Sequence, residues 1–215
     1  MAVDDVRSGF RRSWSDLASV GRNTAGGYDR FAWTRTDHDL REWFAGEASD
    51  LGLDLTTDRV GNQWAWWGDP YAAGAAPAVV TGSHLDSVPS GGAFDGPLGV
   101  VSSLLAVRSL RAAGHRPDRP MAVVNFVDEE GARFGVACAG SRILTGALSP
   151  ERALALTDAD GTTMADALAA AGRDPLALGS DPDLVGRIGA FVELHVEQGR
   201  ALDDVHANVG VGSHI

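Results

Sequence analysis

Lysine is absent from this sequence, and all 18 basic residues are arginine. Acidic residues number 29, so the formal net charge is −11. A surface with this charge repels nucleic-acid phosphates and anionic lipid headgroups. We therefore expect no nucleic acid and no membrane among the partners of the protein. The exclusive use of arginine, beside abundant alanine and glycine, indicates a codon bias rather than a function.

Cysteine and long hydrophobic runs are also scarce. The single cysteine, Cys138, cannot form an internal disulfide and suits a reducing compartment. The longest apolar-rich run, GPLGVVSSLLAV, is too short and too interrupted to span a bilayer. The first residues, MAVDDVRSGFRRSW, contain early acids and no apolar stretch, so no secretory signal is expected. These absences predict a cytoplasmic protein.

The remaining composition is that of a globular protein, with 44% hydrophobic and 22% charged residues. Residues 34–51 predict an amphipathic helix, in which Thr36 and Asp39 resemble a capping box. Residues 53–69 predict two strands joined by a turn near residues 58–62. Three aromatic side chains in these strands are interpreted as packing residues, with a ligand-stacking platform as the alternative: Trp64, Trp66 and Trp67.

The next segment predicts a strand over 78–84, a helix over 96–114 and a strand over 121–130. Pro97 is typical of a first helical turn, and Gly114 of a helix end. Strand, helix and strand of these lengths form a βαβ crossover, which joins parallel strands.

A later strand over 189–198 follows two helical pieces near 162–171 and 181–187. The predicted fold class is therefore α/β, with a mixed, largely parallel central sheet and helices on both faces.

Ligands of open α/β sheets collect beyond the carboxyl ends of the strands. His84 and the pair Glu129–Glu130 lie at such ends, and His195 lies late in its predicted strand. We therefore expect these side chains to converge on one rim of the sheet.

The stretch GSHLDSVPSGGAFDG has the residue types of a metal site. His84 is a ligand candidate, and Asp86 points to the same side, where it could accept the other imidazole N–H. Asp95 follows a glycine turn, and its two oxygens could bridge two metals. Glu129 and Glu130 end the next predicted strand. One of them could bind a metal while the other acts as general base toward the reacting water.

Each of these features also has a structural interpretation without chemistry. The histidine could be a strand-end residue with a local hydrogen bond, and DEE could be a solvated acidic corner. ELHVEQG could be an edge strand with one polar face. The occurrence of four such features at successive strand ends favours a metal site.

The motifs GSHLDSVPSGGAFDGPLGV, DEEGARFG and ELHVEQGRALD together resemble the dinuclear-metal amidohydrolases. These include N-carbamoyl-L-amino-acid hydrolases, ureidopropionases and allantoate amidohydrolases. The resemblance runs from about residue 20 to the end of the chain. It implies a zinc-peptidase-like catalytic domain, a small ureido compound as substrate, and two divalent metal ions, zinc or manganese.

By position, the resemblance places His84 and His195 on one metal and Glu130 on the other, with Asp95 bridging them. The remaining roles concern three further residues: Glu129 as the general base, Asp86 as the residue that orients the first histidine, and Gln198 in the substrate pocket. The implied reaction is hydrolysis of a ureido C–N bond by a metal-activated water. A cis peptide bond is expected between Asp95 and Gly96, because related enzymes have one there.

Two departures from the family stand out. Arg200 occupies a position where proline is usual. The resemblance also implies that residues 1–215 correspond only to the N-terminal portion of the catalytic domain. Relatives continue into a lid domain, through which they form homodimers, and the missing part supplies a further histidine ligand and a substrate-binding arginine. His214 is not expected to replace that histidine, and three other histidines are expected to be exposed: His38, His115 and His206.

Two alternatives to such a hydrolase remain. The chain could be a truncated fragment that turns nothing over. For the 215-residue chain alone we expect at most weak metal retention and negligible hydrolysis in either case. It could also be a related deacylase or aminopeptidase on the same scaffold, although HVEQG argues against this.

Overall fold

The computed structural model describes residues 3–212. His214 therefore lies outside the described residues. The helices and strands follow in this order: α1 (Val3–Leu17), α2 (Arg35–Asp50), β1 (Asp54–Thr57), β2 (Gln63–Trp67), β3 (Ala78–His84), α3 (Pro97–Ala112), β4 (Met121–Phe126), α4 (Ala139–Leu144), α5 (Pro150–Leu154), α6 (Met164–Ala170), the 3₁₀ helix η1 (Pro175–Ala177), α7 (Pro182–Gly186), β5 (Ile188–Val192) and α8 (Ala201–Asp204).

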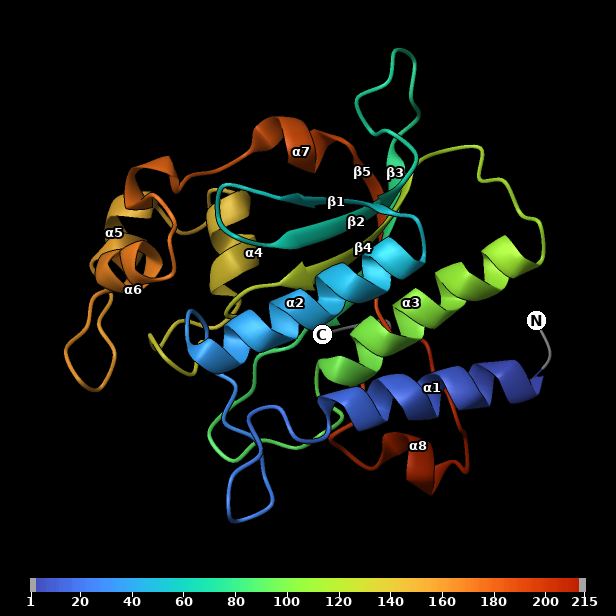
Figure 1. The fold of residues 1–215 in the computed structure, drawn as a ribbon, viewed down its shortest axis with the longest axis horizontal. Helices are drawn as coiled ribbons and strands as arrows, with labels where there is room; N and C mark the ends of the chain where they lie inside the picture. Colours follow the sequence, from blue (N-terminus) through green and yellow to red (C-terminus); the bar gives the residue numbers. More distant parts are fainter. Residues whose placement is uncertain (1–2, 213–215) are drawn as a thin grey trace.

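The strands form one open sheet in the order β1-β2-β4-β3-β5 (Figure 1). β3 pairs in parallel with β4 and β5, whereas β2 pairs antiparallel with β1 and β4. The parallel pair β3–β4 is connected through α3, as the βαβ pattern predicted. The predicted α/β class is confirmed.

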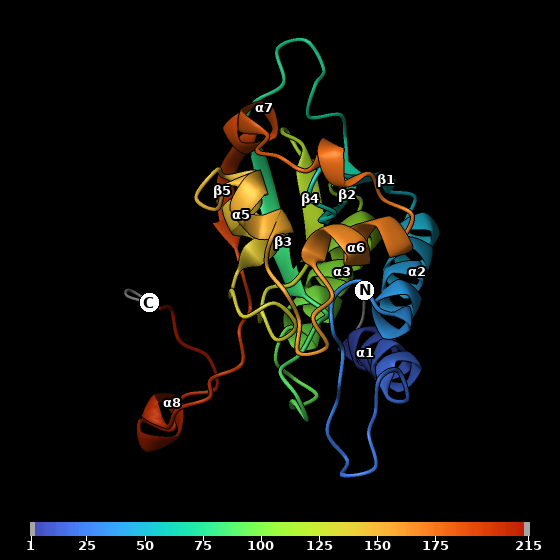
Figure 2. The same ribbon diagram turned by 90° about the vertical axis from the view of Figure 1, so that its left-hand side faces the viewer.

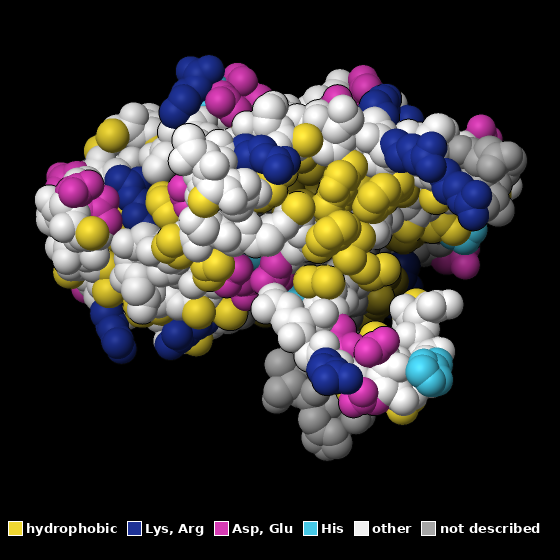
Figure 3. Space-filling view, turned by 90° about the horizontal axis from the view of Figure 1, so that it is seen from below, with side chains coloured by type: hydrophobic (Ala, Val, Ile, Leu, Met, Phe, Trp, Pro, Cys, Tyr) yellow, Lys and Arg dark blue, Asp and Glu magenta, His cyan; other side chains and the backbone are white. Residues whose placement is uncertain are grey.

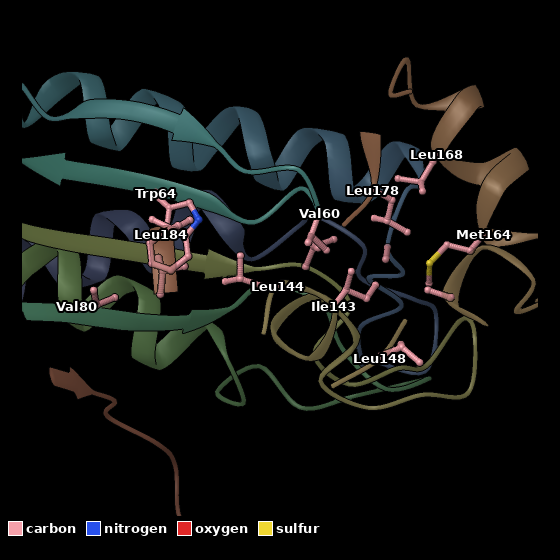
Figure 4. Close-up of a cluster of buried hydrophobic side chains, with 14 of the residues drawn as sticks. Val60, Trp64, Val80, Ile143, Leu144, Leu148, Met164, Leu168, Leu178 and Leu184 are labelled. Carbon is pink, nitrogen blue, oxygen red and sulfur yellow. The ribbon is translucent and has the colours of Figure 1, made fainter. Parts of the chain in front are cut away.

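Alternating residues of the central strands build a core on each face of the sheet. Ala65 and Val123 face the core that α2 and α3 cover, whereas Trp64 and Val124 face the core formed with α4 to α7. Figure 4 shows the second core, which extends from Trp64 to the side chains of the later short helices. This alternation follows from the two-residue period of a strand, and it uses both faces because helices cover both. Packing is confirmed for Trp64 and for Trp66, which are 0% and 3% exposed.

The helix ends agree with the sequence except at the start of α2. Pro97 opens α3, and Gly114 follows its end with a φ of +74°. For α2 the predicted cap at Thr36 is wrong, because Thr34 is the N-cap and accepts a hydrogen bond from the backbone N–H of Asp37. The Asp37 carboxylate in turn accepts the N–H of Trp33. The capping pair therefore lies two residues earlier than predicted.

Two strands are shorter than predicted, and both ends matter for the site. β4 ends at Phe126 because the N–H of Val127 donates to the Asn62 side chain instead of a neighbouring strand, and Asp128 has a φ of +52°. β5 ends at Val192, so the prediction of a strand to residue 198 was wrong. The backbone pairing of β5 with β3 ends there. The next residue, Glu193, contacts β3 through its side chain, because its carboxylate accepts a hydrogen bond of 2.5 Å from the Ser83 hydroxyl.

After β5 the chain leaves the sheet, and α8 stands apart from the rest of the molecule (Figure 2). Among the described residues, β5 borders only β3, and it is largely exposed. Within residues 3–212, no helix has the length and apolarity needed to cross a membrane. The exposure predicted for three histidines is confirmed: His38, His115 and His206.

Candidate metal centre

His84 is the last residue of β3, and its ring is 3% exposed. Its Nδ1 lies 3.0 Å from the backbone carbonyl oxygen of Asp86. Because a carbonyl only accepts, a neutral His84 ring carries its proton on Nδ1 and leaves Nε2 with a free lone pair. Nε2 faces Asp95 and Glu129. In its neutral form the ring is therefore held in the tautomer that a metal ligand needs.

The Asp86 carboxylate connects the ends of β3 and β4. Its Oδ1 lies 3.4 Å from Nδ1 of His84, but the Asp86 carbonyl oxygen is closer at 3.0 Å, so the backbone rather than the predicted carboxylate is the hydrogen-bond partner of the ring. Its two oxygens also accept the backbone N–H groups of Glu129 and Glu130, at 3.2 Å and 3.0 Å. Asp86, which is 6% exposed, thus holds the backbone of the two glutamates as well as lying against the imidazole.

Asp95 lies between the two histidines of the predicted site. Its Oδ1 is 3.9 Å from Nε2 of His84 and 3.4 Å from Nε2 of His195. Its Oδ2 accepts a hydrogen bond from the Gln198 side-chain amide. His195 and Gln198 lie beyond the end of β5, and both are exposed. The structure therefore brings both histidines and the glutamine to one carboxylate.

The two glutamates beyond β4 occupy different places. Glu130 contributes a carboxylate oxygen to a group with His84 and Asp95 in which all ligand atoms lie within 4.8 Å of one another. Glu129 directs Oε2 to within 3.4 Å of Nε2 of His84. Glu130 thus belongs to the group of potential ligands, and Glu129 lies beside that group; their roles stay a prediction.

The glycine turn before Asp95 is held by a segment that the sequence analysis did not connect with the site. Tyr28 and Gly91 exchange two backbone hydrogen bonds of 3.0 Å and 2.9 Å. The Asp29 carboxylate accepts the backbone N–H of Ser90 at 2.7 Å. A side chain at Gly27 would come within 2.8 Å of the backbone of Ser90. The sequence contains no local signal for this contact, because it joins residues about sixty positions apart.

The predicted cis bond between Asp95 and Gly96 is absent, since the described residues contain no cis peptide bond. Gly96 instead has φ +80° and ψ −65°, a tight-turn conformation that only glycine adopts at low cost. A Cβ at this position would lie 2.6 Å from the His84 ring. The glycine therefore supplies both the chain reversal and the space for the histidine.

Charge is unevenly distributed in this cluster, which combines two histidines with four carboxylates. Burial disfavours the charged form of His84, but its contacts with Asp86 and Glu129 outweigh this effect and raise its pKa to about 9. Burial also raises the pKa of Glu130, and Asp95 and Glu129 add to the rise, against the opposing effect of His84. Close carboxylates repel one another unless a cation lies between them.

The donor set fits a divalent transition metal. Imidazole nitrogen and carboxylate oxygen are the usual protein ligands of zinc and related ions. A cation would neutralise part of the surplus negative charge and would replace the proton on Nε2 of His84. A second group of potential ligands lies on the exposed surface of α2, comprising His38, Asp39 and Glu42. In that group Asp39 already pairs with Arg35 at 2.9 Å.

One face of the molecule carries both charged and hydrophobic side chains. Seen from below (Figure 3), acidic side chains with a small area of histidine lie near the middle of the face, beside a broad hydrophobic patch. The projecting segment with α8 carries acidic, arginine and histidine side chains. Phe94, next to Asp95, is 50% exposed and stacks on Trp14 with ring centroids 4.9 Å apart.

Comparison with known proteins decides the family. Residues 80–212, more than half of the chain, match peptidase family M20/M25/M40. The chain belongs to this family. The M20 match includes every residue of the candidate centre, from His84 to Gln198.

Individual relatives show which members of this family the chain resembles. An N-carbamoyl-L-amino acid amidohydrolase of Geobacillus stearothermophilus is 39% identical over 199 residues, which are 91% of this chain and 47% of that protein. An allantoate amidohydrolase of Escherichia coli is 33% identical, over 97% of this chain and 50% of that protein. The crystal structure of a hydantoinase/carbamoylase family amidase from Burkholderia ambifaria superposes with a TM-score of 0.80 and 40% identity, over 93% of this chain and 47% of that one.

These comparisons confirm the resemblance to the amidohydrolases that the motifs indicated. The chain spans about half the length of the curated relatives that it matches. The comparisons therefore establish the fold and the family of this chain. They do not establish the activity of a protein of the relatives' full length.

Proposed function

We propose that this M20 chain carries the metal-binding half of a hydrolase that cleaves the ureido C–N bond of an N-carbamoyl amino acid or of allantoate. The observation that carries the proposal is the convergence of His84, Asp95 and Glu130 within 4.8 Å, with Glu129 beside them. Ureido compounds are supported as the substrate class by the names of two relatives, an N-carbamoyl-L-amino acid amidohydrolase and an allantoate amidohydrolase.

The proposed cofactor is a pair of divalent ions, zinc or manganese, that would polarise the carbonyl group and increase the acidity of water. His84 and His195 would hold one ion, Glu130 the other, and Asp95 both. The His84 ring is preset by the Asp86 carbonyl, and the Asp86 carboxylate fixes the backbone that carries Glu130. Residues of the chain thus prepare the site before an ion arrives.

Glu129 is the proposed general base. Its position beside the proposed ligands leaves it able to take a proton from the attacking water and to return that proton to the leaving nitrogen. For an N-carbamoyl amino acid, one water is consumed and the amino acid, carbon dioxide and ammonia are released. Gln198, whose amide donates to Asp95, lies where it could contact the substrate.

A substrate panel tests the proposal. The test protein is one that contains this chain and has the full length of the relatives. It is loaded with zinc or manganese. We expect ammonia release from N-carbamoyl-L-amino acids or from allantoate, and little hydrolysis of N-acetyl amino acids or dipeptides. Preferential hydrolysis of the acetyl compounds or dipeptides would instead assign the deacylase or aminopeptidase alternative. The absence of hydrolysis with every substrate would favour the non-enzymatic alternative.

A further inference from the structure

The segment that carries Glu129 is held along its length by the start of α4. The backbone N–H groups of three successive residues donate to the carbonyl oxygens of residues 129, 128 and 127 in turn: Cys138, Ala139 and Gly140. A side chain at Gly140 would overlap the carbonyl oxygen of Val127, so the two segments lie at the closest approach that a backbone allows. Residues 138–140 therefore fix the backbone of residues 127–129.

The side chain of Cys138 adds a contact to the carboxylate itself. Its Sγ lies 3.2 Å from Oε1 of Glu129, where the thiol donates a hydrogen bond. The other oxygen, Oε2, lies 3.4 Å from Nε2 of His84. One oxygen of Glu129 is therefore held by the thiol, and the other is turned toward the proposed ligands.

The backbone at Cys138 is arranged to make this contact. Cys138 has a φ of +56°, which is in the left-handed region of backbone conformation. Residues other than glycine, asparagine and aspartate rarely occupy this region. Such a conformation persists only where surrounding contacts enforce it. The hydrogen bonds from residues 138–140 supply that enforcement, and the thiol is thereby aimed at Glu129.

We propose that Cys138 is a positioning residue that holds Oε1 of Glu129 and so directs Oε2 into the reaction site. The inference rests on the proposed function, in which Glu129 is the base. The contact itself can be tested without any turnover, because Cys138 is the only cysteine of the chain. Any thiol signal therefore comes from this residue.

Infrared spectroscopy of the S–H stretching band tests the contact in the 215-residue chain. Hydrogen bonding to a carboxylate lowers the frequency of this band. We expect Glu129→Ala to raise it to the value of a free thiol, and the matched change Glu130→Ala to leave it near its original position. Equal frequencies in the unchanged chain and in Glu129→Ala would overturn the proposal.

Kinetics separate positioning from simple packing. In a protein of the relatives' full length, Cys138→Ala should lower kcat about five- to tenfold with unchanged KM and metal content, the size expected for one lost hydrogen bond. Cys138→Ser retains a donor and should restore kcat to within about twofold. Thr145→Val, at the other end of α4, is the control for loss of a small polar group.

Unchanged kcat in Cys138→Ala, or a serine variant no better than the alanine variant, would contradict positioning. If the unchanged protein hydrolyses no ureido compound, the proposed function fails, and the infrared comparison still decides whether the thiol holds Glu129.

Discussion

At the scale of single residues, the ring of the proposed ligand His84 is held in place by the chain itself. Its Nδ1 faces a backbone carbonyl, and its Nε2 faces carboxylates. Burial lowers the pKa of the ring, but Asp86 and Glu129 outweigh burial, so the pKa rises from an ordinary value of 6.5 to about 9. Without metal, the ring therefore carries a proton on Nε2 that an arriving cation must displace.

The raised pKa of His84 predicts a pH dependence. A group whose pKa is higher in the folded chain stabilises that chain fully below its unfolded pKa and loses this contribution as pH rises through the folded pKa. The free energy of unfolding of the metal-free chain should therefore fall between about pH 6.5 and about pH 9. Urea unfolding across this range measures it, with His84→Gln as the comparison. A variant with the same slope as the unchanged chain would show that His84 does not titrate as stated.

The division of labour between the two glutamates gives a second prediction. Glu129→Gln should retain metal affinity and lose turnover by about 10²- to 10⁴-fold, because only the proton carrier is removed. Glu130→Gln should weaken metal binding, because it removes a proposed ligand. Calorimetric metal titrations and kcat in a protein of the relatives' full length measure the two effects. Metal loss confined to Glu129→Gln would mean that the roles are reversed.

At the scale of elements, the junction between the glycine turn and α3 places Asp95 against His84. Gly96 has a positive φ, and its missing Cβ leaves room for the imidazole. Gly92, four residues earlier in the same turn, has open space around it. The two glycines look alike in sequence, but only one of them is in contact with the site.

Gly96→Ala should therefore destabilise the folded chain by about 1–3 kcal/mol, through backbone strain and displacement of His84. It should also weaken metal binding. Gly92→Ala is the matched control and should change neither quantity appreciably. Urea unfolding and metal titration of both variants test this. Equal stability of the two variants would show that the close approach at Gly96 is not required.

The elements themselves could largely be predicted from the sequence, because hydrophobic period and cap residues act locally. The bounds of β3 and the parallel arrangement followed from such signals. The ends of β4 and β5, the support of the turn by Tyr28 and Asp29, and the contact of Cys138 with Glu129 could not be predicted in this way. Each depends on a hydrogen bond between distant segments, for which the sequence has no local pattern.

At the scale of the whole molecule, the sheet has an open edge at β5. Phe191 and Val192 are 44% and 59% exposed, and within residues 3–212 only β3 pairs with this strand. An exposed apolar edge strand is a site for pairing with other chains. The open edge lies beside the segment that carries His195 and Gln198.

The chain by itself should therefore associate at high concentration through β5. Val192→Lys places a charge on this edge and should reduce light scattering at a given concentration. Leu176→Lys, at a side chain that is 91% exposed and lies outside the strands, is the matched control and should have a smaller effect. A larger effect of Leu176→Lys would place the associating surface elsewhere.

The central claim is that Asp95 joins the ends of β3, β4 and β5 into one metal centre. The most direct measurement is equilibrium dialysis of the 215-residue chain against zinc or manganese, with bound metal measured by atomic emission. We predict weak but saturable binding of up to two ions per chain, which Asp95→Asn abolishes and Asp39→Asn, in the surface group on α2, leaves intact. Equal binding by the unchanged chain and by Asp95→Asn, or no saturable binding by the unchanged chain, would contradict the account.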